Sequence, residues 1–213
     1  GGVGREVIGN GYVTGNDQRK IQKFDSCGNV VLMWGSYGDG YCLYWYDVRR
    51  DLHSFPTRLS TDHNSARVQK FNSSGQFLTM WGTNGTGDGQ FLSPSGIAVD
   101  NQGNVYVTDN DQKKIQKFDS SGNFLLSWGS YGDGDGQFTN NLSIAADNQG
   151  NVFVIDYNSH RVQMFNSSGQ FLTMWGTNGT GDGQFRSPRG IAVDNQGNVY
   201  VTDNDQHKIQ KFD

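Results

Sequence analysis

The sequence predicts an all-β fold, and three observations carry this prediction. Short apolar runs alternate with turns rich in Gly and Asn, and Gly accounts for 30 of the 213 residues. No stretch shows the periodicity of an amphipathic helix, and the Gly-rich segment 82–89 would interrupt any helix placed across it. The same order of runs and turns also returns at a fixed interval along the chain.

This interval is 47 residues. It is marked by the motif Ile/Val-Gln-x-Phe, whose five copies begin at positions 21, 68, 115, 162 and 209, and by Trp at positions 34, 81, 128 and 175. The similarity is stronger at twice the interval, because residues 96–119 and 190–213 differ only where Lys113 is replaced by His207. The duplicated unit is therefore an alternating pair of repeats.

Within one repeat, the run at 96–100 and the β-branched and aromatic run at 105–108 flank a turn in which Gly103 can adopt positive φ. A polar loop leads to a third strand at 115–118, and another turn leads to a fourth strand at 124–128. A four-stranded sheet of this size cannot bury both faces alone. Copies arranged radially can, so the repeats predict a β-propeller of four-stranded antiparallel blades.

We expect a single propeller over residues 1–213 with about 4.5 blades. The repeats are phased at about 1–47, 48–94, 95–141, 142–188 and 189–213, and the last one is incomplete. Such a number of blades does not close a ring, so the chain is expected to be part of a longer propeller or a subunit completed by another chain. Because two repeat types alternate, an even number joins unlike neighbours at every interface, which favours a ring of six.

The stretches 1–15 and 41–61 keep the register of the repeat but lose its motif. In the second of them, Arg49, Arg50 and Asp51 replace the apolar residues of an inner strand. Burial of these charges without partners would be costly, so a disordered or atypical inner hairpin is expected there.

The motifs of the third repeat resemble those of a known family. Pro94-Ser-Gly-Ile-Ala-Val-Asp100, Gly103-Asn-Val-Tyr-Val-Thr-Asp109, Ile115-Gln-Lys-Phe118 and Trp128-Gly129 closely resemble the NHL repeat. The resemblance covers nearly all of the chain and is most complete in repeats three to five. It implies a propeller whose loop rims serve as recognition surfaces.

The loops between second and third strands, together with the links between blades, are predicted to share one face, which we call the loop face. The predicted ligand-binding residues are residues of the loops on this face: Asp109, Asn110, Asp111, Lys113, Lys114, Tyr157, His160, Arg161, Asp203, Asn204, Asp205, His207 and Lys208. The sequence thus predicts a non-catalytic binding or scaffold propeller that recognises a protein, peptide or glycan.

Two other functions stay open. A self-assembling surface protein could be built from incomplete propeller arcs joined between chains. The RNA-binding mode of some NHL proteins is disfavoured, because the chain has 17 Lys and Arg against 21 Asp and Glu and its net charge is −4.

No apolar run approaches the length of a membrane span, so no membrane insertion is expected. The compartment is left open, and an extracellular or cell-surface location is favoured.

We expect no enzyme activity, cofactor or metal. Asp133 and Asp135 resemble the start of a calcium loop, but no third carboxylate completes the pattern, and equivalent links carry a single Asp. His160 and His207 occupy equivalent slots, and two ligands are too few for a zinc site. The zinc-dependent peptidyl-hydroxyglycine lyase has this propeller form, but the metal-binding histidines such an enzyme needs are not visible here.

Five Asn-x-Ser/Thr sequons occur, at Asn72, Asn84, Asn141, Asn166 and Asn178. They would accept glycans only on a secretory route. Duplication of Asn-rich turns also produces such sequons without any selection for sugar.

Overall fold

A computed structural model describes residues 11–15, 20–24, 30–34, 43–44, 57–62, 66–72, 74 and 76–213. All regular structure in these residues is β-strand, as predicted. No helix long and apolar enough to cross a membrane occurs among them.

The strands form five successive antiparallel sheets, which we number as blades I to V. Blade I holds β1 (Gly11–Gly15), β2 (Lys20–Phe24) and β3 (Val30–Trp34). Blade II holds β4 (Leu43–Tyr44), β5 (Thr57–Asp62), β6 (Arg67–Asn72) and β7 (Phe77–Trp81). Blade III holds β10 (Pro94–Val99), β11 (Val105–Asp109), β12 (Lys114–Phe118) and β13 (Phe124–Trp128). Blade IV holds β16 (Asn141–Ala146), β17 (Val152–Asp156), β18 (Arg161–Phe165) and β19 (Phe171–Trp175). Blade V holds β20 (Pro188–Val193), β21 (Val199–Asp203) and β22 (Lys208–Phe212).

The links between blades contain short parallel pairs. β8 (Thr83–Asn84) pairs with β9 (Gln90–Phe91), and β14 (Ser130–Tyr131) pairs with β15 (Gln137–Phe138). A bridge between Asn178 and Phe185 takes the same place before blade V.

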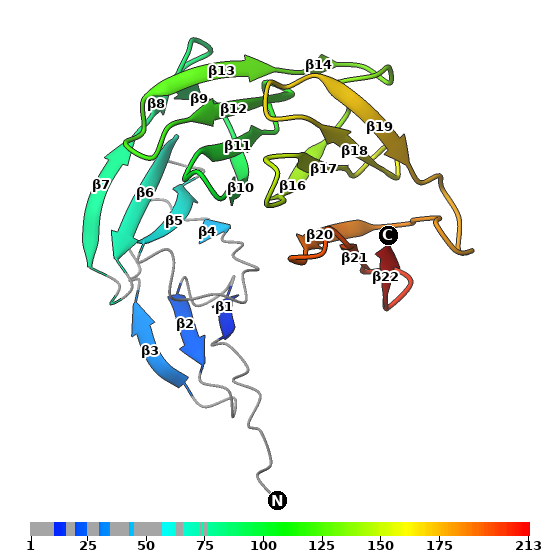
Figure 1. Cartoon of the computed structure of the whole chain (residues 1–213), viewed down its shortest axis with the longest axis horizontal. Helices are drawn as coiled ribbons and strands as arrows, with labels where there is room; N and C mark the ends of the chain where they lie inside the picture. Colours follow the sequence, from blue (N-terminus) through cyan, green and yellow to red (C-terminus); the bar gives the residue numbers. More distant parts are fainter. Residues whose placement is uncertain are drawn as a thin grey trace, which may run out of the picture.

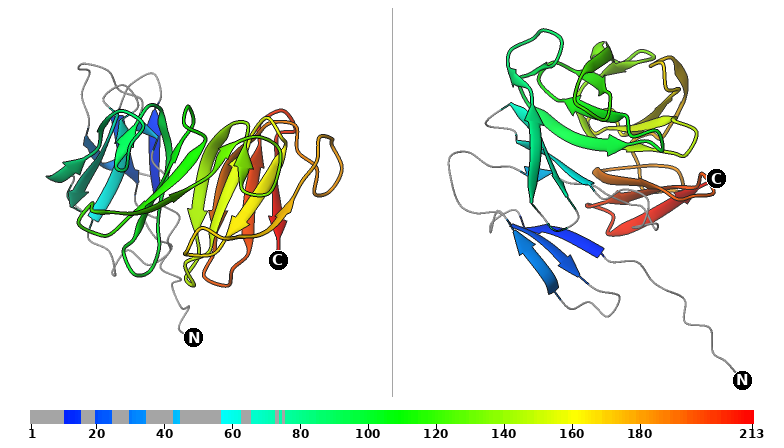
Figure 2. Two further views of the ribbon diagram at one scale, coloured as in Figure 1. Left: turned by 90° about the horizontal axis from the view of Figure 1, so that it is seen from above. Right: turned by 60° about the vertical axis from the view of Figure 1, so that its left-hand side comes forward.

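The blades stand side by side around a central space, with β10, β16 and β20 innermost and β7, β13 and β19 outermost (Figure 1). The left view of Figure 2 shows the strands of neighbouring blades running across the thickness of the disc. The arc is open between blade I and blade V (Figure 1). This arrangement confirms the predicted β-propeller with antiparallel blades. The ring size and the repeat boundaries stay predictions.

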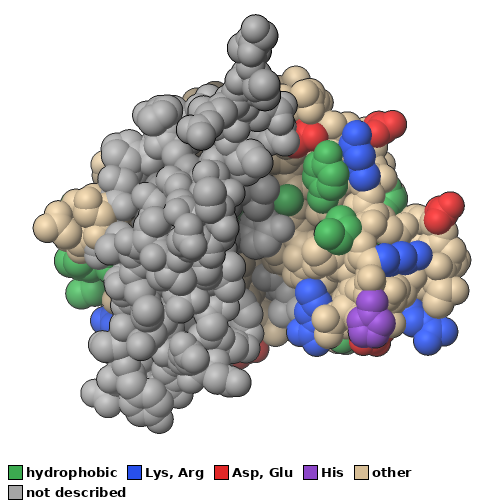
Figure 3. All heavy atoms as spheres, turned by 90° about the horizontal axis from the view of Figure 1, so that it is seen from below, with side chains coloured by type: hydrophobic (Ala, Val, Ile, Leu, Met, Phe, Trp, Pro, Cys, Tyr) green, Lys and Arg blue, Asp and Glu red, His purple; other side chains and the backbone are tan. Residues whose placement is uncertain are grey.

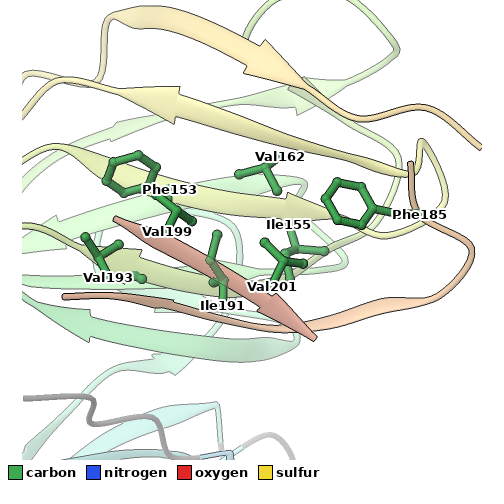
Figure 4. Close-up of a cluster of buried hydrophobic side chains, with 9 residues drawn as sticks. Phe153, Ile155, Val162, Phe185, Ile191, Val193, Val199 and Val201 are labelled. Atoms are coloured by element: carbon green, nitrogen blue, oxygen red, sulfur yellow. The ribbon is translucent and has the colours of Figure 1, made fainter. Parts of the chain in front are cut away.

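The hydrophobic cores lie between blades. One cluster joins Ala98, Tyr106 and Ile115 of blade III to Ile144 and Phe165 of blade IV. Figure 4 shows the corresponding cluster between blades IV and V, which also includes Phe185 from the link. Because these clusters of described residues remove apolar surface from water where two blades meet, each blade gains hydrophobic stabilisation from its neighbour.

The regularly spaced Trp residues mark these interfaces. Trp at the end of a fourth strand packs on Phe at the end of the next blade's third strand, with ring centroids 5.9 Å apart for Trp81 and Phe118 and 5.8 Å apart for Trp128 and Phe165. The Phe that closes each link packs on the same third-strand Phe, as Phe91 does on Phe118 at 5.8 Å. The 47-residue spacing of these aromatic residues is therefore the spacing of the blade interfaces.

The Gln of the repeated motif ties each link to a blade. Gln116 is buried, its Oε1 accepts a hydrogen bond from the Gly89 amide at 2.9 Å, and its Nε2 donates to the Gln90 carbonyl at 2.6 Å. Gln163 and Gln210 make the equivalent pairs of bonds in blades IV and V. A polar residue recurs in an inner position because it satisfies both a donor and an acceptor of the link.

Blade II departs from the pattern. Its first strand β4 has two residues, and Leu43 lies opposite Asp62. In blade III, Pro94 lies opposite Asp109, which is the residue equivalent to Asp62. The partner of this Asp therefore comes from a different position of the repeat in blade II. The disordered or atypical inner hairpin expected for the second repeat stays a prediction. Most of the two degenerate stretches lies outside the described residues.

Candidate recognition surface on the loop face

The loops between second and third strands are held by buried carboxylates. Asp109, which ends β11, accepts hydrogen bonds from the amides of Leu92 at 2.7 Å and Ser93 at 3.1 Å in the link. It also accepts from the amides of Asp111 and Gln112 in its own loop, at 3.1 and 3.0 Å. One side chain thus fixes both the link that enters the blade and the loop that leaves its second strand.

The bonds from the carboxylate to the link recur in blades IV and V. Asp156 accepts from the amides of Thr139 and Asn140, and Asp203 accepts from Arg186 and from Ser187. Burial by itself would raise the pKa of Asp203, but these amides and the Gln206 side chain stabilise its charge, so its pKa is lowered overall.

A second set of contacts joins the loops to the links. The side-chain Nε2 of Gln112 donates to the carbonyls of Gly85 at 3.2 Å and Gln90 at 3.0 Å, and Gln206 Nε2 makes the equivalent contacts in blade V. These bonds hold the rim of the loop face in one shape.

Blade IV makes the same connection with different residues. Ser159 stands in the slot of Gln112, and Arg161 donates to the carbonyls of Asp133 at 2.6 Å and Gln137 at 3.0 Å. Its guanidinium also pairs with Asp156 at 3.2 Å, and the Arg161 side chain is only 8% exposed. Arg161 therefore acts in holding the loop, a role that its place in a polar loop did not indicate.

The other predicted ligand-binding residues divide by exposure. Asp109 and Asp203 are buried in the clamps just described. Those that face solvent most fully are Asp111, Asn204, Asp205 and His207. Those that are half-buried are Asn110, Lys113, Lys114, Tyr157, His160 and Lys208. The structure thus places the exposed members on loops whose shape is fixed by the buried members.

The slot that holds Lys113, His160 and His207 has an unusual backbone. These residues adopt φ values of 56°, 54° and 51°, and Ala66 in the equivalent position has a φ of 50°. The left-handed conformation closes the loop before the third strand, and non-Gly residues adopt it at a cost in free energy. The slot is therefore defined by its backbone conformation, and side chains as different as Ala, Lys and His occupy it.

Arg189 was not among the predicted residues. Its guanidinium lies 4.6 Å from the centre of the Tyr157 ring, and Nη2 lies 3.5 Å from the Tyr157 hydroxyl. That hydroxyl also lies 3.1 Å from Ser187 Oγ. An exposed Arg is thus held over an aromatic ring where blades IV and V meet.

A comparison of the duplicated units could have identified this position. Residues 70–119 and 164–213 differ only in the pairs Lys70 and Met164, Leu92 and Arg186, Ser95 and Arg189, and Lys113 and His207. Three of these four pairs lie on the loop face, whereas the turns of the opposite face are identical. The two units have therefore diverged mainly on the loop face.

The acidic link before blade IV shows no set of converging ligands in the described part of the chain. Asp133 and Asp135 are exposed, and Asp133 Oδ1 accepts a hydrogen bond from Ser159 Oγ at 3.3 Å. No group of three His, Cys, Asp or Glu residues that could hold a metal ion is found among the described residues.

Comparison with known proteins supports the repeat assignment. A family model described as the NHL repeat matches residues 91–118, 142–165 and 185–212, which cover the first three strands of blades III, IV and V apart from Asn141 at the start of β16. Comparison with curated protein sequences gives no match.

Solved structures with the same fold include several propellers of different kinds. A nidogen/laminin complex structure is 19% identical with a TM-score of 0.66, and the match covers 97% of this chain and 72% of that one. A streptogramin B lyase structure is 15% identical with a TM-score of 0.63, covering 96% of this chain and 65% of that one. The WD40 propeller domain of Doa1 is 13% identical with a TM-score of 0.63, covering 96% and 60%.

This chain therefore spans about two thirds of the length of these structures, and at such identities the likeness concerns the fold alone. The segments that match the family model are those that the structure folds into the radial sheets of blades III to V. The chain carries NHL repeats, and these repeats fold as the blades of a β-propeller.

Proposed function

We propose that this protein is a non-catalytic binding propeller that recognises a protein or peptide, or a glycan, through its loop face. The observation that carries the proposal is the pair of Arg189 and Tyr157, an exposed cation stacked on an aromatic ring at the junction of two blades. A guanidinium held in this way can still donate to a carboxylate on a ligand, while the ring offers apolar surface.

The loops beside this pair are preformed. The buried Asp109, Asp156 and Asp203 fix each loop from within, so little conformational entropy is lost when a ligand contacts the exposed residues around them. Asp111, Asp205 and His207 then supply polar groups at the rim. A rigid scaffold that presents charges of both signs around an aromatic side chain suits the recognition of a ligand better than the catalysis of a reaction.

The comparisons support a protein partner among these ligand classes. One of the similar folds is described within a nidogen/laminin complex, which is an assembly of two proteins. The negative net charge and the pairing of the buried Arg161 with Asp156 disfavour a nucleic acid.

The proposal is tested by screening the purified protein against arrays of peptides and glycans. We expect to find ligands whose binding is lost with Tyr157→Ala and with Arg189→Ala. Their binding should be kept with Lys211→Ala, which changes an exposed side chain on β22. Binding that is unchanged by Tyr157→Ala and by Arg189→Ala would overturn the proposal, and so would the absence of any ligand in the arrays. Retention on single-stranded RNA at low salt would replace it with the RNA-binding alternative. A molecular mass in solution that corresponds to many copies of the chain would favour the alternative of a self-assembling surface protein.

A further inference from the structure

The loop face of blade V carries charges that the loop face of blade III lacks. Arg186 stands in the slot of Leu92 and Arg189 in the slot of Ser95, whereas the third difference on this face exchanges one basic residue for another. Figure 3 shows the molecule from below Figure 1, and on its described surface Lys and Arg side chains lie on both sides of a His. Two guanidinium groups have thus been added to one rim of a chain whose net charge is −4.

The backbone of β20 turns Arg189 towards blade IV. The pairing of β20 with β21 shifts between Pro188 and Gly190, so Arg189 is the extra residue of a β-bulge. A bulge redirects the side chain that it carries. The guanidinium consequently lies over the ring of Tyr157, 4.6 Å from its centre, at the junction of blades IV and V.

Arg186 lies beside the same junction, in the link that enters blade V. Its backbone amide donates to Asp203 Oδ2 at 2.7 Å, and the next residue, Ser187, has its Oγ 3.1 Å from the Tyr157 hydroxyl. The backbone of Arg186 is therefore fixed, while its side chain is exposed. Leu92 is also exposed, at 36%, so this slot lies at the surface in both duplicated units.

Neither guanidinium has an acidic partner in the described part of the chain. The ion pairs found there lie elsewhere, one in the loop of blade IV and one between residues 211 and 213. The buried Asp203 already accepts hydrogen bonds from backbone amides of the link and from the Gln206 side chain. Both Arg side chains thus keep donors with which they can bind a carboxylate in the two-point geometry that guanidinium favours.

The two positions are close enough to contact one short ligand. Residues that are three apart in an extended segment have their Cα atoms at most about 10 Å from each other. In an extended peptide, alternate side chains point to the same side and are about 7 Å apart. Two carboxylates separated by one residue therefore match the reach of Arg186 and Arg189.

The stacking of Arg189 on Tyr157 favours a peptide over a nucleic acid or an acidic glycan. The guanidinium covers one face of the ring, and nucleic-acid bases need an open aromatic face on which to stack. Long anionic polymers of either kind also meet the negative net charge of the chain. A short acidic segment of a protein pairs with the two guanidinium groups without these costs.

We propose that Arg186 and Arg189, together with Tyr157, form a binding site for a short extended peptide segment in which two carboxylates are separated by one residue. Each guanidinium pairs with one carboxylate, and the Tyr157 ring holds the Arg189 guanidinium in place before the ligand arrives. This inference rests on the proposed function and narrows its ligand to an acidic segment of a protein.

The experiment screens the purified chain against synthetic peptides of equal length that carry Glu-x-Glu, Gln-x-Gln or a single Glu, with varied flanking residues. Fluorescence anisotropy then gives the affinities of selected peptides at low and at physiological ionic strength. We expect Glu-x-Glu peptides to bind most tightly and to weaken by about tenfold when either Glu is replaced by Gln, the effect of losing one charge-assisted hydrogen-bonded pair. Their affinity should also fall as salt is added.

Variants of the protein can exchange residues that the two duplicated units already carry. Arg186→Leu and Arg189→Ser install the residues of blade III in equivalent places, so the fold should tolerate them, and thermal unfolding checks this. Each should weaken Glu-x-Glu binding by about tenfold, and the two together should remove the preference over Gln-x-Gln. Met164→Lys is the matched control, because it exchanges a differing residue on β18 and should leave affinity unchanged.

Combining the two kinds of change assigns each pair of charges. The loss caused by Arg189→Ser should be smaller for a peptide in which the Glu that pairs with Arg189 is already Gln. A purely structural role of Arg189 would instead weaken all peptides by the same factor.

Three results would overturn this inference and can be told apart. Equal affinity for Glu-x-Glu and Gln-x-Gln, or equal effects of Arg186→Leu and Met164→Lys, would remove the acidic ligand. Neutral peptides or glycans that bind through Tyr157 and Arg189 would also remove it, while the proposed function would stand. Absence of any ligand for the folded chain would overturn both.

Discussion

At the scale of single residues, a few buried polar side chains explain why the repeat keeps polar residues where its sheets are otherwise apolar. Gln116 satisfies one amide and one carbonyl of the link, and Asp109 satisfies amides of both link and loop. Removing such a side chain leaves buried backbone groups without partners, which costs more than the net value of the bonds themselves.

We expect Gln116→Leu to lower the free energy of unfolding by about 1–3 kcal/mol, because Gly89 N loses its side-chain acceptor and Gln90 O keeps only its bond from Gln112. Denaturant titration measures this change. The control is Gln102→Leu in an exposed turn, which should alter stability by less than about 0.5 kcal/mol. Equal effects of the two changes would show that Gln116 does not tie the link to blade III.

Asp194 gives a prediction for pH. Hydrogen bonds from the Asn198 side chain and backbone, together with the Tyr200 hydroxyl, outweigh desolvation and lower its pKa from 3.8 to about 2. Because the folded-state pKa lies below the unfolded one, this contribution to stability is present above about pH 4 and is lost as the pH falls towards 2.

Asn198→Ala removes the side-chain amide that donates to Asp194, so it should raise the pKa of Asp194 towards its ordinary value. An NMR titration of the carboxyl carbon measures it directly. An unchanged pKa in the variant would mean that Asn198 does not hold the charged form.

At the scale of elements, the turn before a fourth strand is constrained by its contact with the preceding blade. Gly122 has a φ of 90° and rests on Trp81, whereas Gly197 has a φ of 89° in a turn where a Cβ would meet nothing within 4 Å. Both positions disfavour a side chain by conformation, but only Gly122 also lacks room for one.

We expect Gly122→Ala to be more destabilising than Gly197→Ala by at least about 1 kcal/mol, the cost of moving the turn or the indole. Thermal or chemical unfolding of the two variants gives the difference. If both lose the same stability, the turn does not pack on Trp81 as described.

Most of the strands of blades III to V could be predicted from the sequence, because their signals are local. Runs such as Val105–Asp109 alternate with turns whose Gly adopts positive φ, and repetition strengthens each signal. The role of Arg161 could not be predicted, because it depends on carbonyls of a link more than twenty residues away. The Tyr157 and Arg189 pair also joins two blades, so composition of either loop alone gives no sign of it.

At the scale of the whole molecule, the cores lie at blade interfaces, so the blades should stabilise one another along the arc. Ile115 of blade III is fully buried in a cluster that contains Ile144 and Phe165 of blade IV. The neighbouring blade thus contributes to the burial of this repeated apolar position.

A double-mutant cycle between Trp128 and Phe165, which belong to neighbouring blades, tests this central claim most directly. Replacing each residue by Leu, singly and together, should reveal a coupling of about 0.5–1.5 kcal/mol in the free energy of unfolding. The control pair, Trp128 and Phe212, lies across different interfaces and should be additive. Additive effects for Trp128 and Phe165 as well would contradict a propeller whose blades share their cores.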